Sequence, residues 1–78
     1  MKKISTLPQK SYTIGIKEVM VAIKSGSVKN VIVASNCPRF LLDRIEKAGA
    51  EIEVFAGDQQ ELGTKLGRPF PVVVIGYQ

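Results

Sequence analysis

The 78-residue sequence contains no histidine, no tryptophan and a single cysteine, Cys37. Without histidine, the chain lacks the side chain that most often serves as a general base near neutral pH. One thiol cannot form an internal disulfide, and one cysteine with scattered carboxylates offers no metal site of known spacing. We therefore expect no cofactor, no metal ion and no enzymatic activity.

Long hydrophobic runs are also absent. The apolar residues stand in short runs separated by glycine and proline, and none approaches the roughly 20 residues of a membrane-spanning helix. The first eight residues carry two lysines without the apolar stretch of a signal peptide behind them. These absences predict a cytoplasmic protein, and the lone cysteine is typical of that compartment. The length predicts one small domain without a deep pocket.

Acidic residues are scarce in the first half of the chain. Residues 1–39 hold seven Lys or Arg against one Glu, whereas residues 40–78 hold four against six Asp or Glu. The net charge is +4 and the isoelectric point is about 9.5. A basic half indicates contacts with phosphate groups, although lysines that only keep a small protein soluble are the alternative explanation.

Strands and helices alternate along the predicted domain, residues 11–78, which follows a polar tail over residues 1–10. The pattern predicts strands over 10–14, 28–34, 51–54 and 71–75, the last beginning with proline as an edge strand or the start of a strand would. Apolar residues at helical spacing predict one helix that starts at Ile16 and is closed by Gly26, a second after Pro38, and a third over 59–66. This alternation favours an α/β sandwich around one sheet.

Cys37 is the best catalytic candidate, because it follows a buried strand at the start of a helix, where a thiolate is stabilised. The arginines after it do not fit a phosphatase loop, since Arg39 is too close and Arg44 lies one residue beyond the required spacing. A plain turn cysteine is the alternative reading. Gly57, Gly63 and Gly67 match no phosphate-binding motif and are better explained as two caps and one close helix contact.

Three ordered segments resemble the archaeal and eukaryotic large-subunit ribosomal protein L-thirty-e family, within the L-seven-Ae kink-turn RNA-binding superfamily. They are Tyr12-Thr13-Ile14-Gly15-Ile16-Lys17, then Lys29-Asn30-Val31-Ile32-Val33-Ala34-Ser35-Asn36-Cys37-Pro38, and finally Glu61-Leu62-Gly63-Thr64-Lys65-Leu66-Gly67-Arg68-Pro69-Phe70. The resemblance covers residues 10–77. It implies a three-layer α/β/α sandwich around one mixed four-stranded sheet, and a structural protein of the large ribosomal subunit that holds a kinked or looped RNA.

The resemblance also implies an RNA site built from three loops at one end of the sheet. In this role Gly15 lets the backbone approach sheared G·A pairs, Asn36 hydrogen-bonds a base or the backbone, and Phe70 stacks on a nucleotide turned out of the helix. The RNA-binding residues it implies are Gly15, Ile16, Lys17, Glu18, Asn36, Pro38, Arg39, Gly67, Arg68 and Phe70. Each has a plainer explanation beside it: a strand-end core ring for Phe70, a helix cap for Asn36 and a solvated lysine for Lys17.

Two departures from the family pattern are visible. The family's first helix of about twenty residues is missing before Tyr12, and the segment from Pro38 to Ala50 is several residues short. We expect RNA or a neighbouring subunit to complete the fold. Other functions stay open: a free-standing kink-turn protein of an RNA-modification or RNA-processing particle, an interaction module without RNA, and a small thiol enzyme or phosphocarrier that uses Cys37.

Overall fold

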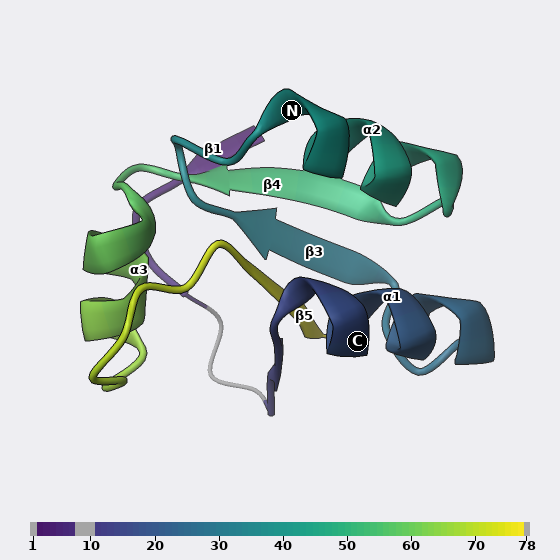
Figure 1. Cartoon of the computed structure of the whole chain (residues 1–78), viewed down its shortest axis with the longest axis horizontal. Helices are drawn as coiled ribbons and strands as arrows, with labels where there is room; N and C mark the ends of the chain where they lie inside the picture. Colours follow the sequence, from purple (N-terminus) through teal and green to yellow (C-terminus); the bar gives the residue numbers. More distant parts are fainter. Residues whose placement is uncertain (1, 8–10, 78) are drawn as a thin grey trace.

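A computed structural model describes residues 2–7 and 11–77 of the chain (Figure 1). Strands and helices alternate over nearly its whole length. In chain order the elements are β1 (Lys2–Ile4), β2 (Thr13–Ile14), α1 (Ile16–Ser25), β3 (Asn30–Val33), α2 (Arg39–Lys47), β4 (Glu51–Phe55), α3 (Gln59–Lys65) and β5 (Val74–Tyr77). None of the described helices is long and apolar enough to cross a membrane.

The strands form one mixed sheet in the order β1-β4-β3-β5-β2. Strands β1, β4 and β3 run parallel, whereas β5 is antiparallel to both β3 and β2. Strands β2 and β3 therefore end at the same edge of the sheet at which β5 begins. The chain segments that follow β2 and β3 and the segment that precedes β5 meet at this edge, toward which the arrow of β3 points in Figure 1.

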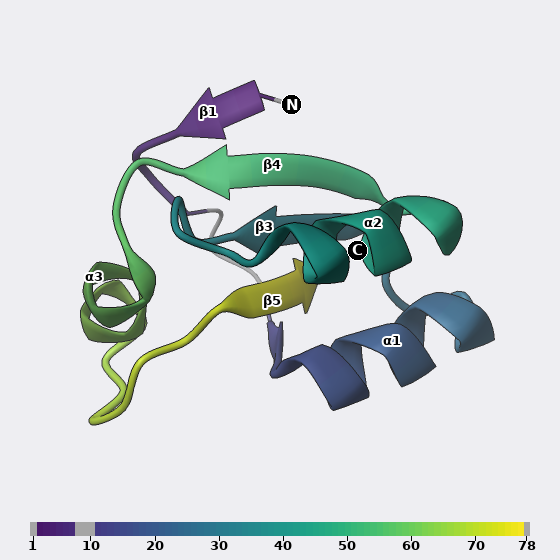
Figure 2. The same ribbon diagram turned by 45° about the horizontal axis from the view of Figure 1, so that its top comes forward.

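The helices cover both faces of the sheet, which confirms the predicted three-layer α/β/α sandwich (Figure 2). On one face, Val19 of α1 and Ile45 of α2 pack against Val31, Val33 and Val74. On the other face, Leu62 of α3 packs in a second cluster with residues such as Ile32, Phe55 and Ile75. Burial of β3 on both faces agrees with its unbroken apolar sequence.

Helix boundaries follow the local sequence signals closely. Helix α1 ends where Gly26 adopts a left-handed conformation, with φ of 83°, and the Gly26 N–H donates to the Ala22 and Ile23 carbonyl oxygens. Helix α2 begins after Pro38 and buries Leu41 and Ile45, as the apolar spacing predicted. Helix α3 begins at a capping box in which Asp58 and Glu61 each accept a hydrogen bond from the other's backbone N–H.

The predicted tail is wrong for residues 2–4, which form the edge strand β1. This strand pairs in register with β4, Lys3 opposite Val54 and Ile4 opposite Phe55. Ile4 and Leu7 pack against the cluster on the α3 face. Over the described residues the sheet therefore has five strands rather than the predicted four, because Ile4 and Leu7 gain apolar burial that a polar tail lacks. The remainder of the predicted tail that falls on residues 8–10 lies outside the described residues.

The last strand begins three residues later than predicted and lies inside the sheet. Strand β5 starts at Val74 and stands between β3 and β2, so it is not an edge strand. The preceding residues bond elsewhere, since the Val72 N–H donates to the Gln59 carbonyl oxygen and the Val73 carbonyl accepts from the Ala34 N–H. Pro71 therefore stands before the ladder and removes no donor from it.

Candidate nucleic-acid interface

The ten residues that the sequence singled out come from three chain segments at one edge of the sheet. The first segment, residues 15–18, follows β2, and the second, residues 34–39, follows β3. The third, residues 66–73, leads into β5. We call the surface they form the loop surface, and its candidate residues are Gly15, Ile16, Lys17, Glu18, Asn36, Pro38, Arg39, Gly67, Arg68 and Phe70. All are exposed except Gly15 and Ile16, which are half-buried.

The first segment depends on the backbone of Gly15. Its φ of 99° and ψ of 145° form the N-cap of α1, and a positive φ of this kind disfavours every residue with a side chain. The Gly15 N–H donates to the Val74 carbonyl oxygen at 3.2 Å, which ties the segment to β5. A Cβ at this position would meet no other atom within 4 Å, so the glycine leaves open space in front of the backbone. Lys17 and Glu18 follow on the exposed first turn of α1.

The second segment is anchored by the side chain of Asn36. Its Oδ1 accepts a hydrogen bond from the Gln59 N–H at 3.0 Å, at the first residue of α3. The neighbouring Ser35 N–H donates to the Gly57 carbonyl oxygen at 2.8 Å. Asn36 does not cap the helix that follows it, because the N-cap of α2 is Pro38 and no side chain caps it; its oxygen instead accepts from the first N–H of α3, the helix that Asp58 caps. The amide nitrogen of Asn36 is not used in this bond, so Asn36 can both support the loop and offer a donor to a ligand.

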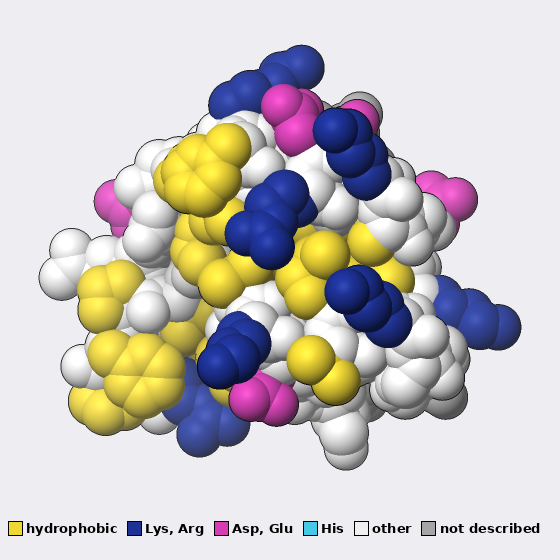
Figure 3. Space-filling model, turned by 45° about the vertical axis from the view of Figure 1, so that its right-hand side comes forward, with side chains coloured by type: hydrophobic (Ala, Val, Ile, Leu, Met, Phe, Trp, Pro, Cys, Tyr) yellow, Lys and Arg dark blue, Asp and Glu magenta, His cyan; other side chains and the backbone are white. Residues whose placement is uncertain are grey.

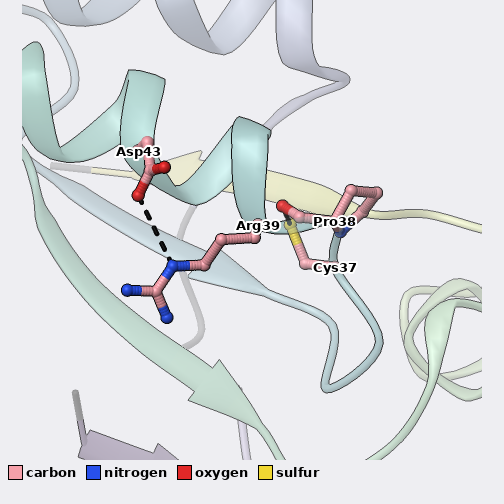
Figure 4. Close-up of polar contacts among 4 residues, drawn as sticks. All are labelled: Cys37, Pro38, Arg39 and Asp43. Atoms are coloured by element: carbon pink, nitrogen blue, oxygen red, sulfur yellow. Dashed lines mark hydrogen bonds and ion pairs between the residues drawn. The ribbon is translucent and has the colours of Figure 1, made fainter.

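Cys37, Pro38 and Arg39 join this segment to α2 (Figure 4). The Cys37 thiol is half-buried and lies 3.6 Å from the Pro38 carbonyl oxygen, as a weak donor. Burial raises the pKa of Cys37, which disfavours the thiolate that a nucleophile needs. The Arg39 Nε lies 3.6 Å from the Oδ1 of Asp43, which stands one turn along the helix. Both side chains are largely exposed, so this ion pair is weak and leaves the guanidinium available.

The third segment lies close against α3 because residue 63 is a glycine. A Cβ at Gly63 would collide with the carbonyl oxygen of Phe70, so only glycine lets the backbone of this loop approach the helix. Helix α3 ends at Lys65 with Leu66 as its C-cap, and Gly67 directly after the cap has a φ of 74°. The Arg68 N–H then donates back to the Gly63 carbonyl oxygen at 2.9 Å. Gly63 is thus the close helix contact that was expected for one of Gly57, Gly63 and Gly67.

Phe70 is half exposed and lines a shallow groove of about 220 Å³. The groove combines an aromatic ring, a guanidinium and polar side chains: its lining residues are Gln60, Thr64, Arg68, Pro69, Phe70 and Pro71. The ring's 50% exposure rules out the explanation of Phe70 as a strand-end core residue. A flat aromatic face beside a cation is suited to stacking on a nucleobase.

The second and third segments share one anchoring residue. The Gln59 N–H binds Asn36 in the second segment, and the Gln59 carbonyl oxygen accepts from Val72 in the third. Three cations, Lys17, Arg39 and Arg68, come one from each segment. The structure therefore brings the ten predicted residues to one edge on a framework held by backbone hydrogen bonds.

The sequence analysis did not identify Phe40, the second residue of α2, as an exposed aromatic side chain. Its side chain is 63% exposed, more than that of Phe70. The signal was present in the helical spacing, since Leu41 and Ile45 form the buried side and Phe40 precedes that side by one residue. No group of three or more possible metal ligands occurs within the described part of the chain.

A family model described as "Ribosomal protein L7Ae/L30e/S12e/Gadd45 family" matches residues 1–78. The chain belongs to this family. Membership in a family of ribosomal proteins, rather than of enzymes, agrees with the absence of catalytic function expected from the sequence.

Relatives with known names agree with this assignment. The chain is 39% identical over 64 residues to large ribosomal subunit protein eL30 of Archaeoglobus fulgidus, covering 82% of this chain and 74% of the relative. It is 38% identical over 65 residues to the protein of the same name from Yarrowia lipolytica, covering 78% of this chain and 60% of the relative. The chain therefore spans about three fifths to three quarters of these relatives.

Two solved structures share the fold. One is a protein of unknown function from Bacillus halodurans C, with a TM-score of 0.69 and 30% identity, covering 85% of this chain and 69% of that one. The other is the Giardia lamblia 15.5kD RNA binding protein, with a TM-score of 0.71 and 21% identity, covering 86% of this chain and 59% of that one. The second likeness concerns the fold alone.

Proposed function

We propose that this chain binds ribosomal RNA through the loop surface and stabilises a kink-turn or a similar bent loop in the large ribosomal subunit. The supporting observation is the geometry of three segments that present an open glycine backbone, an anchored amide and an exposed ring at one edge of a rigid sheet. The eL30 relatives are named as large-subunit proteins. The cytoplasmic ribosome is accordingly the proposed location.

Each segment has a distinct task in this proposal. The backbone at Gly15, with Ile16 beside it, approaches the sheared base pairs, while Lys17 meets phosphate or base edges and Glu18 lies next to it. The free amide nitrogen of Asn36 donates to RNA, next to Pro38 and Arg39. Phe70 stacks on an extruded base beside Gly67 and Arg68. Such splayed bases are the usual target of sequence-specific RNA recognition.

A salt-dependent gel-shift titration tests the proposal. The probes are a kink-turn RNA and the same RNA with its tandem G·A pairs replaced. We expect tight binding to the first, loss of affinity on replacement, and a salt slope of about 0.9 per phosphate contacted on duplex-like RNA. Equal, weak binding to both RNAs would show that the basic charge alone acts and would reject kink recognition.

A free-standing particle is the rival within the same binding class. Co-sedimentation of the protein with large ribosomal subunits separates the two, because a protein of an RNA-modification or RNA-processing particle would stay outside that fraction. The thiol-enzyme alternative is less attractive, since burial raises the pKa of Cys37. Unchanged RNA binding by Cys37→Ala is the expected result for a turn cysteine.

A further inference from the structure

A groove runs between α1 and α2, on the sheet face opposite α3. Its volume is about 270 Å³. Side chains from both helices line it: Ile16, Lys17, Met20, Val21, Lys24 and Arg44. It touches the loop surface only at Ile16 and Lys17 and extends away from it along α1.

The floor of the groove is aliphatic and partly open to solvent. Val21 is 61% exposed, and it is one of three large apolar side chains that are so exposed among the described residues. Ile16 and Met20 beside it are half-buried. An apolar side chain inserted here would remove this surface from water, a gain that a phosphate or ribose cannot supply.

The rim of the groove is cationic on both sides. Lys17 and Lys24 stand two turns apart on α1, about 10 Å along its axis, and Arg44 faces them from α2. No carboxylate lines the groove, and the one ion pair recorded between described residues joins Arg39 and Asp43 elsewhere on α2. Figure 3 shows apolar side chains lying between Lys and Arg side chains in the middle of this side of the molecule.

The chemistry of floor and rim selects one class of occupant. RNA would meet cations here but no aromatic ring and no neutral hydrogen-bonding side chain in the lining. A second copy of this chain, with its own net charge of +4, would bring like charges together. We propose that the groove docks an acidic amphipathic segment of a partner protein, with an aliphatic side chain over Val21 and carboxylates at Lys24 and Arg44.

Titration with a designed peptide tests this surface. The probe is a helical peptide of about four turns with Leu on one face and Glu on the others, and its comparison peptide has Lys in place of Glu. We expect the Glu peptide to bind the isotopically labelled protein and to shift NMR amide signals of α1 and α2, with weaker binding at higher salt. Absence of binding, or equal binding of the Lys peptide, overturns the proposal.

Charge-reversal variants separate this groove from the general basic charge. Lys24→Glu with Arg44→Glu is expected to weaken peptide binding by on the order of tenfold or more, and Val21→Glu to weaken it similarly. Lys24→Glu is also measured alone, and Lys65→Glu, a single reversal on α3 across the sheet, is its matched control. Unchanged NMR spectra away from the substituted sites verify that the variants are folded. Equal loss with the control would reject the assignment of the groove.

RNA binding provides an independent readout. We expect Val21→Glu to bind the kink-turn RNA like the unsubstituted protein, and Phe70→Ala to keep peptide binding. If the RNA rather than the peptide occupies the groove, its affinity will fall with Val21→Glu, and the peptide proposal is then wrong. Because the two readouts use different residues, failure of the proposed RNA function leaves the peptide result interpretable, and the reverse also holds.

Discussion

The Asn36 side-chain oxygen accepts a hydrogen bond from the Gln59 N–H at 3.0 Å, across 23 residues of sequence. This bond satisfies one of the N–H groups that a helix start leaves without an intrahelical partner. It also holds the second segment of the loop surface against α3. The same residue, Gln59, accepts from Val72 in the third segment, so a single helix start positions two of the three segments.

Two substitutions at Asn36 separate its structural task from its binding task. Asn36→Ala loses the hydrogen bond and is expected to lower the free energy of unfolding by about 1 kcal/mol. Asn36→Asp keeps the acceptor and should remain near the unsubstituted stability, yet it loses the amide donor and adds a negative charge, so RNA affinity should fall. Denaturant unfolding and gel-shift titration measure the two effects. Full RNA affinity in Asn36→Asp would remove this side chain from the interface.

Gly63→Ala should destabilise the fold and displace the third segment. The added methyl group would collide with the Phe70 carbonyl oxygen, a backbone atom that cannot rotate away. Overpacking of this kind costs about 1–3 kcal/mol, which denaturant unfolding would detect. Thr64→Ala, at an exposed neighbour in the same helix, is the control and should change stability by about 0.5 kcal/mol or less. Equal stability of the two variants would contradict the close approach.

Much of the fold could be predicted because most helices and strands have clear local signals in the sequence. Ile16 and Val19 mark one face of α1, Gly26 closes it, and the run from Val31 to Ala34 indicates a strand buried on both faces. Strand β1 could not be read this way, because three residues with two lysines resemble a solvated tail. Its partner Phe55 lies far along the chain, and only that pairing gives Ile4 a buried place.

The site was predictable only in part, because non-local contacts that the sequence does not reveal also hold its loops. The family resemblance supplied the ten residues and their common edge, whereas the contacts that hold them are non-local. Nothing near Asn36 in the sequence indicates that its oxygen meets Gln59, and nothing near Gly63 indicates the approach of Phe70. Such pairs become visible only when the sheet order brings the loops together.

Gly15→Ala should be costly although space is available. No atom lies within 4 Å of the added Cβ, so the cost comes from the backbone φ of 99° and not from a collision. Strain of this type is worth about 1–3 kcal/mol. We expect a lower unfolding midpoint in denaturant and weaker RNA binding. The alanine variant must either keep the strained backbone conformation or change the conformation of residues 15–18. A variant with unchanged stability would show that this conformation is not required.

The raised pKa of Tyr77 predicts that the protein loses stability in strong base. Its hydroxyl donates to Glu53 Oε1 at 2.7 Å, and this hydrogen bond, together with burial and the Glu53 charge, raises the pKa of Tyr77 from 10.0 to about 12. Because the folded pKa is the higher one, the stabilisation is fully present below pH 10 and is lost as pH rises through about 12.

Comparison with Tyr77→Phe isolates this contribution. Between pH 10 and pH 12 the unsubstituted chain should lose more stability than the variant. Denaturant unfolding at closely spaced pH values measures the difference. Ultraviolet titration of the variant then reports Tyr12 alone, whose pKa is also raised by burial. Parallel stability curves for the two proteins would show that the Tyr77–Glu53 bond does not form.

Phe70 and Phe40 form a matched pair for the stacking proposal, since both rings are exposed and neither supports the core. Phe70→Ala should weaken kink-turn binding by about 1–3 kcal/mol, because a base loses its stacking partner. The salt slope should not change, since no phosphate contact is removed, whereas Arg68→Ala should lower the slope by about one contact. Phe40→Ala should leave both quantities unchanged. A loss with Phe40→Ala that equals the loss with Phe70→Ala would contradict the assignment of the extruded base to the Phe70 groove.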